Sequence, residues 1–209
     1  MDTSGPNSPG TMADDNSVGT VAWTDPDNAK VSDNIYTSAY KPVGTGAGFY
    51  SHILRATNFG FSIPDGHTIL GFKAEFEQLG QRNSTIYSYA VKLINASGTI
   101  VGSGQEDNVP WTTTEGYYTY GTGTTDKWGT SLIYSDVNSS NFGVSLRVYS
   151  NTNSSLDDTA YIDHIRLTVY HEASSGPANL KTYNTNAKAN IKTINTNAIA
   201  NVKTLDTNA

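Results

Sequence analysis

The sequence predicts an all-β protein whose body, residues 18–172, is an antiparallel two-sheet sandwich of the jelly-roll type. Two observations support this fold class. The 209-residue chain contains many Gly, Tyr and small polar residues and only 15% charged residues, which is typical of β proteins rather than helical enzymes. Apolar and polar residues also alternate with a period of two, as in strands with one dry and one solvated face.

The two ends of the chain differ from this body. Residues 1–17 are mostly Gly, Ser, Pro, Asp and Asn, so we expect a polar, flexible N-terminal arm. Residues 173–179 read as a linker, and residues 180–209 as a repeat tail. The arm holds three Asp and no basic residue, whereas the tail holds four Lys and one Asp. The ends are therefore opposite in charge, and the basic tail is able to dock on an acidic neighbour.

Four segments alternate clearly enough to predict strands: 68–78, 85–95, 141–150 and 160–171. Weaker alternation predicts further strands near 19–24, 35–40, 50–57, 99–105 and 116–121. One short helical turn is expected within residues 131–140, just before the third clear strand.

The alternation also assigns residues to faces. In segment 68–78, one face is expected to hold Leu70, Phe72, Ala74 and Phe76. In segment 85–95, one face is expected to hold Tyr87, Tyr89, Val91 and Leu93, opposite Ser88 and Lys92. The last two segments each repeat the pattern, through Phe142, Val144, Leu146 and Val148 and through Ile165, Leu167 and Val169.

Three stretches resemble a known module. They are "ATNFGFSIPDGHTILGFKAEFE", with Asn58 to Pro64 as its first signature, "SDVNSSNFGVSLRV", and "AYIDHIRLTVYH", with Asp163 in the last strand. Over residues 19–171 the chain looks like a jelly-roll module of bacteriophage virion proteins and bacterial surface proteins. The tail repeat is similar to the ends of some phage structural proteins. The resemblance implies a fold and a virion or surface setting, and it supplies no catalytic residues.

No catalytic motif is present. The neighbouring acids Glu106/Asp107 and Asp157/Asp158 lie in polar segments, so we expect solvated loop acids. Adjacent strand residues face opposite ways, so such neighbours do not form an acid/base pair by themselves. The histidines show no metal-ligand spacing: His52, His67, His164 and His171. We therefore expect no enzyme and no cofactor. The net charge of −6 argues against a nucleic-acid partner, and no apolar run reaches membrane-spanning length.

Two small sites are candidates. Asp25, Asp27 and Asp33 could supply oxygen ligands to a structural calcium ion, although Asp-Pro-Asp is also a plain turn sequence, which we favour. A second group is aromatic and could stack on sugar rings, although Tyr and Trp also favour strands and cores: Trp111, Tyr117, Tyr118, Tyr120 and Trp128. Tyr117 and Tyr118 are neighbours, so at least one of them should face away from the core.

The tail repeats an eleven-residue phrase almost three times. Its apolar positions are led by Leu180, Tyr183, Ile191, Ile194, Val202 and Leu205, and Lys181, Lys192 and Lys203 recur once per copy. This spacing fits a right-handed helical supercoil, but the Thr and Asn content favours short strands with turns. A disordered polar tail is the remaining alternative. Because each copy buries too little to be stable alone, we expect the tail to pair with other copies or with a neighbouring subunit.

These features predict a non-enzymatic structural subunit of a virion or an extracellular filament, assembling through its tails as a homo-oligomer or with neighbouring subunits. The alternative is a carbohydrate-binding or adhesion module that contacts surface glycans through its aromatics. A glycan-cleaving enzyme on the same fold would need two carboxylates in one cleft. The expected location is a virion or the extracellular cell surface.

Overall fold

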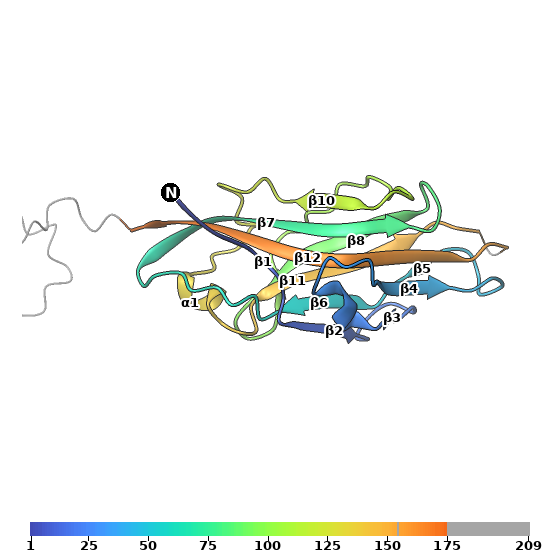
Figure 1. Ribbon diagram of the computed structural model, residues 1–209, viewed down its shortest axis with the longest axis horizontal. Coiled ribbons are helices and arrows are strands. Elements are labelled where there is room, and N and C mark those ends of the chain that lie inside the picture. The colour runs from blue at the N-terminus through green and yellow to red at the C-terminus, as the bar shows by residue number, and fades with distance from the viewer. Residues whose placement is uncertain (154, 175–209) are drawn as a thin grey trace, which may run out of the picture. The chain divides into compact units, whose positions relative to one another are not determined.

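The computed structural model describes residues 1–153 and 155–174 (Figure 1). The chain divides into two units, Met1–Ser174 and Ser175–Ala209. The predictions made for the repeat tail, residues 180–209, therefore lie outside the described residues.

The first unit consists of two six-stranded sheets, and every strand pair in them is antiparallel. Sheet A contains β10 (Gly116–Tyr120), β7 (His67–Gly80), β12 (Asp158–Ala173), β4 (Thr37–Lys41) and β3 (Trp23–Thr24), with β1 (Asp2–Asn7) also on β12. Sheet B contains β2 (Thr11–Asp15), β6 (Ile53–Thr57), β11 (Gly143–Ser150), β8 (Ile86–Ile94) and β9 (Ile100–Val101), with β5 (Phe49–Tyr50) also on β11. A 3₁₀ turn, η1 (Pro26–Ala29), and one helical turn, α1 (Tyr134–Val137), complete it. The predicted all-β, two-sheet sandwich is confirmed.

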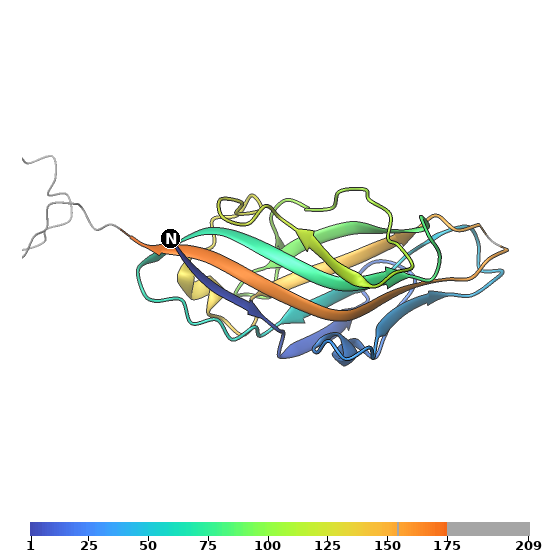
Figure 2. The same ribbon diagram turned by 45° about the horizontal axis from the view of Figure 1, so that its top comes forward.

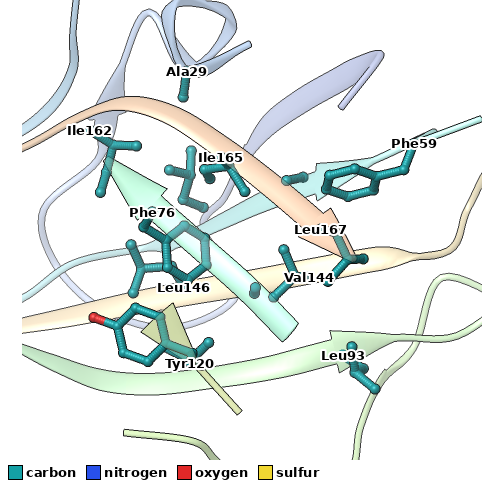
Figure 3. Packing of buried hydrophobic residues seen from close by; sticks show 14 of the residues in the cluster. Ala29, Phe59, Phe76, Leu93, Tyr120, Val144, Leu146, Ile162, Ile165 and Leu167 are labelled. Atoms are coloured by element: carbon teal, nitrogen blue, oxygen red, sulfur yellow. The ribbon is translucent and has the colours of Figure 1, made fainter. Parts of the chain in front are cut away.

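The core lies between the two sheets (Figure 3). Phe76 of β7 and Tyr120 of β10 approach to 5.1 Å between ring centroids, and Leu146 of β11 faces them from sheet B. The largest fully buried side chains include Trp111 and Trp128, which come from the connections on either side of β10. The two connections that flank β10 therefore each add a large side chain to the core formed by the strands.

The N-terminal segment is not the flexible arm that its composition predicts. β1 pairs with β12 and β2 pairs with β6, and β1 runs beside β12 in both ribbon views (Figures 1 and 2). Strand pairing uses main-chain groups, so a polar segment can add to a sheet without burying much side-chain surface. Gly5, with φ of +100°, lies against the chain of β12, where a Cβ would come within 2.6 Å of the Leu167 carbonyl oxygen.

A β-bulge changes the predicted faces of β8. Val91 and Leu93 are buried as the alternation predicts, whereas Tyr87 and Tyr89 are partly or largely exposed on the opposite face. The pairing with β11 shifts next to Arg147, so that Tyr89 is an extra residue without a partner. One extra residue reverses the alternation of everything before it. The prediction that Tyr87 and Tyr89 share a face with Val91 is therefore wrong.

A second β-bulge, in β7, makes the face predicted for Leu70 wrong. Tyr170 pairs with Gly71 and His171 with Ile69, which leaves Leu70 as the extra residue. Ile69 is buried in place of Leu70, with 2% of its surface exposed.

Both helical elements have four residues, and nothing helical in the described part of the chain has the length and apolarity needed to cross a membrane.

Candidate functional site

Four tyrosines and one arginine gather on the outer face of sheet B, and we call them the tyrosine surface: Tyr50, Tyr87, Tyr89, Tyr149 and Arg147. They come from three adjacent strands, β5, β11 and β8. Tyr50 and Tyr89 expose 38% and 46% of their surface. The bulge in β8 creates this surface, because without it Tyr89 would point into the core.

The rings of the tyrosine surface contact one another in a continuous row. Tyr50 lies 4.8 Å from Tyr89 in an edge-to-face arrangement and 4.8 Å from Tyr149 in a tilted one, and Tyr149 lies 6.5 Å from Tyr87. The Arg147 guanidinium lies 4.9 Å from the Tyr50 ring and 5.0 Å from the Tyr89 ring. These distances are typical of aromatic pairs and of cation–π contacts, so the rings hold one another in place.

A groove of about 490 Å³ opens beside the tyrosine surface. Its lining combines aromatic faces with hydroxyl, amide and carboxylate groups: Tyr87, Ser88, Tyr89, Glu106, Asn108, Tyr149 and Asn151. The chain after β9 forms one wall, where Gln105 donates its backbone N–H to Val91 and the Glu106 carboxylate accepts the Val91 N–H at 3.4 Å. Glu106, Asn108 and Asn151 are exposed. The groove therefore offers aromatic rings and exposed hydrogen-bonding groups side by side.

The aromatics predicted to contact glycans lie elsewhere, and most are buried. Trp111, Tyr120 and Trp128 expose 3% or less of their surface and belong to the core, as the alternative to glycan contact has it. The indole N–H of Trp111 donates to the Ser88 hydroxyl at 3.0 Å. Burial raises the pKa of Tyr120 to about 12, so this phenol stays protonated within the core.

Tyr117 and Tyr118 face opposite ways, as neighbours on a strand must. Tyr118 packs against the core, whereas Tyr117 lies on the outer face of sheet A, away from the tyrosine surface. There the Arg166 guanidinium stacks 3.9 Å from the Tyr117 ring and pairs with the Glu75 carboxylate at 3.0 Å. The Tyr117 hydroxyl also lies 2.8 Å from Nδ1 of His164. The Tyr117 side chain is therefore already engaged in polar contacts on the outer face of sheet A.

The same face of sheet A brings three carboxylates together: Glu77, Glu115 and Asp163. Burial raises the pKa of Glu115, and the charges of Asp163 and Glu77 raise it further, although a hydrogen bond with Tyr36 opposes the shift. The spacing of these residues in the sequence carries no signal of this cluster, because β7, β10 and β12 become neighbours only on folding.

The three aspartates that were candidate calcium ligands, Asp25, Asp27 and Asp33, are not brought together in this way. Asp27 forms an ion pair with Lys30 at 2.7 Å, and the Asp33 carboxylate accepts the backbone N–H of Ile35 at 3.0 Å. Asp25 adopts a left-handed backbone just before η1. Among residues 1–153 and 155–174, Asp25, Asp27 and Asp33 do not form a group of convergent metal-ligating atoms. Turn chemistry accounts for their contacts.

The fold and the site define the class of the chain: an antiparallel β-sandwich that carries an exposed aromatic row and an adjoining polar groove on one sheet. No protein-family model and no curated protein matches the sequence.

Weak likenesses to solved structures exist. A chain described as "CBM4 structure and function" is 11% identical, with a TM-score of 0.33 over 66% of this chain and 85% of that one. The N-terminal cellulose-binding domain of a Cellulomonas fimi β-1,4-glucanase C is 8% identical, with a TM-score of 0.32 over 79% and 88% of the two chains. The enzymatically active domain of tailspike protein 4 from bacteriophage CBA120 is 14% identical, with a TM-score of 0.37 over 75% of this chain and 18% of that one. These likenesses are too weak to say what this chain binds.

Proposed function

We propose that the protein is a non-enzymatic carbohydrate-binding or adhesion module that holds a glycan on the tyrosine surface and in the adjoining groove. The observation that supports this proposal is the row formed by Tyr50, Tyr89 and the partly exposed Tyr149, beside the exposed polar groups of Glu106, Asn108 and Asn151. The proposal keeps the glycan function suggested by the sequence but moves it from the loop aromatics to sheet B.

The chemistry of a sugar ring suits this surface. A pyranose has an apolar face of C–H groups and a rim of hydroxyls, so it binds where aromatic rings lie next to hydrogen-bonding side chains. Tyr50 and Tyr89 would supply the ring faces, and Asn108 would supply donors and acceptors at the rim. The contacts between the rings and Arg147 restrict their motion before any ligand arrives, which lowers the entropy cost of binding.

Aromatic pairs across strands also stabilise a sheet without binding anything. The two roles differ in what a substitution does. A purely structural pair would change stability when truncated, whereas a binding residue would change affinity while the fold is retained.

Glycan-array screening of the intact protein, followed by calorimetry on the ligand found, tests the proposal. We expect Tyr89→Ala to weaken binding by roughly tenfold or more, equivalent to about 1.4 kcal/mol, and Tyr89→Phe to retain most of it, because the ring carries the contact. Tyr40→Ala is the matched control, since Tyr40 is a similarly exposed strand tyrosine on sheet A. If no glycan binds, or if Tyr89→Ala binds as well as the unchanged protein, the proposal is wrong.

We also propose a second role, as a structural subunit of a virion or an extracellular filament that assembles through its C-terminal repeats. The observation that favours it is the eleven-residue repeat of residues 180–209, in which each short copy carries few apolar residues, fewer than a core of its own would need. A strand from such a tail could add to an open sheet edge of another copy, with main-chain hydrogen bonds supplying the affinity. The two roles are compatible, because an adhesive surface gains avidity from being repeated.

Deletion of residues 178–209 tests this second role. We expect the intact protein to form oligomers in analytical ultracentrifugation and the truncated protein to sediment as a monomer with its glycan binding per chain unchanged. Equal assembly of the two proteins, or a monomeric intact protein at high concentration, would refute the assembly role while leaving the glycan proposal untouched.

A further inference from the structure

Two histidines that are 104 residues apart in the sequence meet at one end of sheet A. His67 opens β7, and His171 lies near the end of β12. Their Nδ1 atoms are 2.8 Å apart, and the Asp2 carboxylate on β1 lies 3.9 Å from Nδ1 of His67. The three ligand atoms lie within 4.8 Å of one another. The spacing of the histidines in the sequence carries no hint of this arrangement.

We propose that His67, His171 and Asp2 form a binding site for a divalent transition-metal ion, with zinc as the fitting probe. Two imidazole nitrogens and one carboxylate are a ligand set that suits zinc and its neighbours, whereas calcium and magnesium prefer oxygen alone. The fourth position of a tetrahedral ion would remain open to water.

The distances need only small adjustments to hold the ion. Bonds of about 2.0–2.1 Å in a tetrahedral site place the ligand atoms roughly 3.3 Å apart. The two histidine nitrogens at 2.8 Å would separate slightly, and the exposed Asp2 carboxylate would move inward. Asp2 keeps 59% of its side-chain surface exposed, so it is free to make this movement.

The surroundings of His171 favour the tautomer whose Nδ1 can bind a metal ion. Its Nε2 lies 3.0 Å from the Ser4 hydroxyl, which can accept the Nε2–H and so leave the Nδ1 lone pair free. His171 exposes only 4% of its surface, and burial, with the charge of the neighbouring His67, lowers its pKa. Without an ion, one Nδ1–H would instead donate to the other Nδ1, and this is the competing account of the short contact.

The ion would tie three strands together. Asp2 belongs to β1 and pairs with His171 of β12; the register of this strand pair shifts between Ser4 and Asn7. A bound metal would therefore hold the N-terminal strand against sheet A. This role is independent of the tyrosine surface, which lies on the other sheet.

Calorimetric titration of tag-free protein with zinc, with calcium as the comparison ion, tests the site. We expect one zinc ion per chain, no comparable binding of calcium, and slower amide exchange in β1 when zinc is present. His67→Gln and Asp2→Asn should each weaken zinc binding by about tenfold or more, because each removes a ligand. Both positions are partly exposed, so these variants should fold.

His52→Gln is the matched control, because His52 also has a carboxylate partner, Asp14 at 2.8 Å, and lies outside the cluster. It should bind zinc as the unchanged protein does. Absence of saturable zinc binding, or equal binding by His67→Gln, would overturn the proposal and would indicate that the two histidines only share a hydrogen bond.

Discussion

Replacing Trp128 with alanine is expected to lower the free energy of unfolding by about 3–5 kcal/mol. Trp128 is fully buried, and its indole N–H donates to the Phe72 carbonyl oxygen at 3.2 Å. The residue lies between β10 and α1 and adopts a left-handed backbone, with φ of 53°. A bulky residue tolerates that conformation only where packing compensates for it. Removal of the indole would leave a large cavity between the loop and β7.

Urea denaturation measures this effect, and Trp128→Phe is the control. Phenylalanine restores most of the buried surface but not the hydrogen bond, so its loss should be smaller, about 1–3 kcal/mol. An alanine variant within about 1 kcal/mol of the unchanged protein would mean that this loop does not pack on the core in solution. The prediction also matters for ligand binding, since any glycan defect of Trp128→Ala would then reflect unfolding rather than a lost contact.

Replacing Asp158 with alanine is the second change expected to have a large effect, a loss of about 3 kcal/mol or more. Asp158 has no exposed surface, contrary to the expectation that it is a solvated loop acid. Its carboxylate accepts hydrogen bonds from the hydroxyls of Ser150, at 2.7 Å, and Thr152, and from the backbone N–H of Thr159 at 3.0 Å. Alanine would leave these donors without an acceptor inside the protein.

A buried lysine increases the expected effect of losing Asp158. Lys41 lies opposite Asp158 in the β4–β12 pairing and exposes 1% of its surface. Its ammonium group donates to the carbonyl oxygens of Asn153, at 3.3 Å, and Leu156, at 2.8 Å, in the connection that precedes Asp158. Because residues paired in an antiparallel ladder project to the same face, removal of the carboxylate would take a negative charge from the same buried region as this lysine.

The control for this prediction is Asp158→Asn, which keeps the shape and one acceptor oxygen but removes the charge. In denaturant unfolding, the free energy of unfolding of Asp158→Asn should lie between that of the unchanged protein and that of Asp158→Ala. If alanine costs less than about 0.5 kcal/mol, the buried network contributes little to stability, and the prediction is wrong. If Asn costs as much as alanine, the charge matters more than the hydrogen bonds do.

The tyrosine surface illustrates why part of the candidate site could not be predicted from the sequence. Tyr87 and Tyr89 are visible in the sequence, but a strict period of two assigns them to the same face as Val91. The bulge that turns them outward depends on how β11 pairs with β8, beside Arg147. Bulges have weak local signals, because one inserted residue leaves the composition of a strand unchanged. The loop aromatics differ in the opposite direction. Trp111 and Trp128 lie in polar segments, which suggests exposure, but their side chains are part of the core.

The sequence by itself determined the fold class and the approximate positions of most strands after residue 18, because burial on one side of a sheet imposes a period of two on a strand. It also determined the buried faces of β11 and β12. Only the tertiary structure decided that a polar N-terminal segment joins both sheets, that the tyrosines face outward, and that His67 meets His171. These features depend on pairing between segments far apart in the chain. Main-chain hydrogen bonds and strand register, rather than local composition, control that pairing.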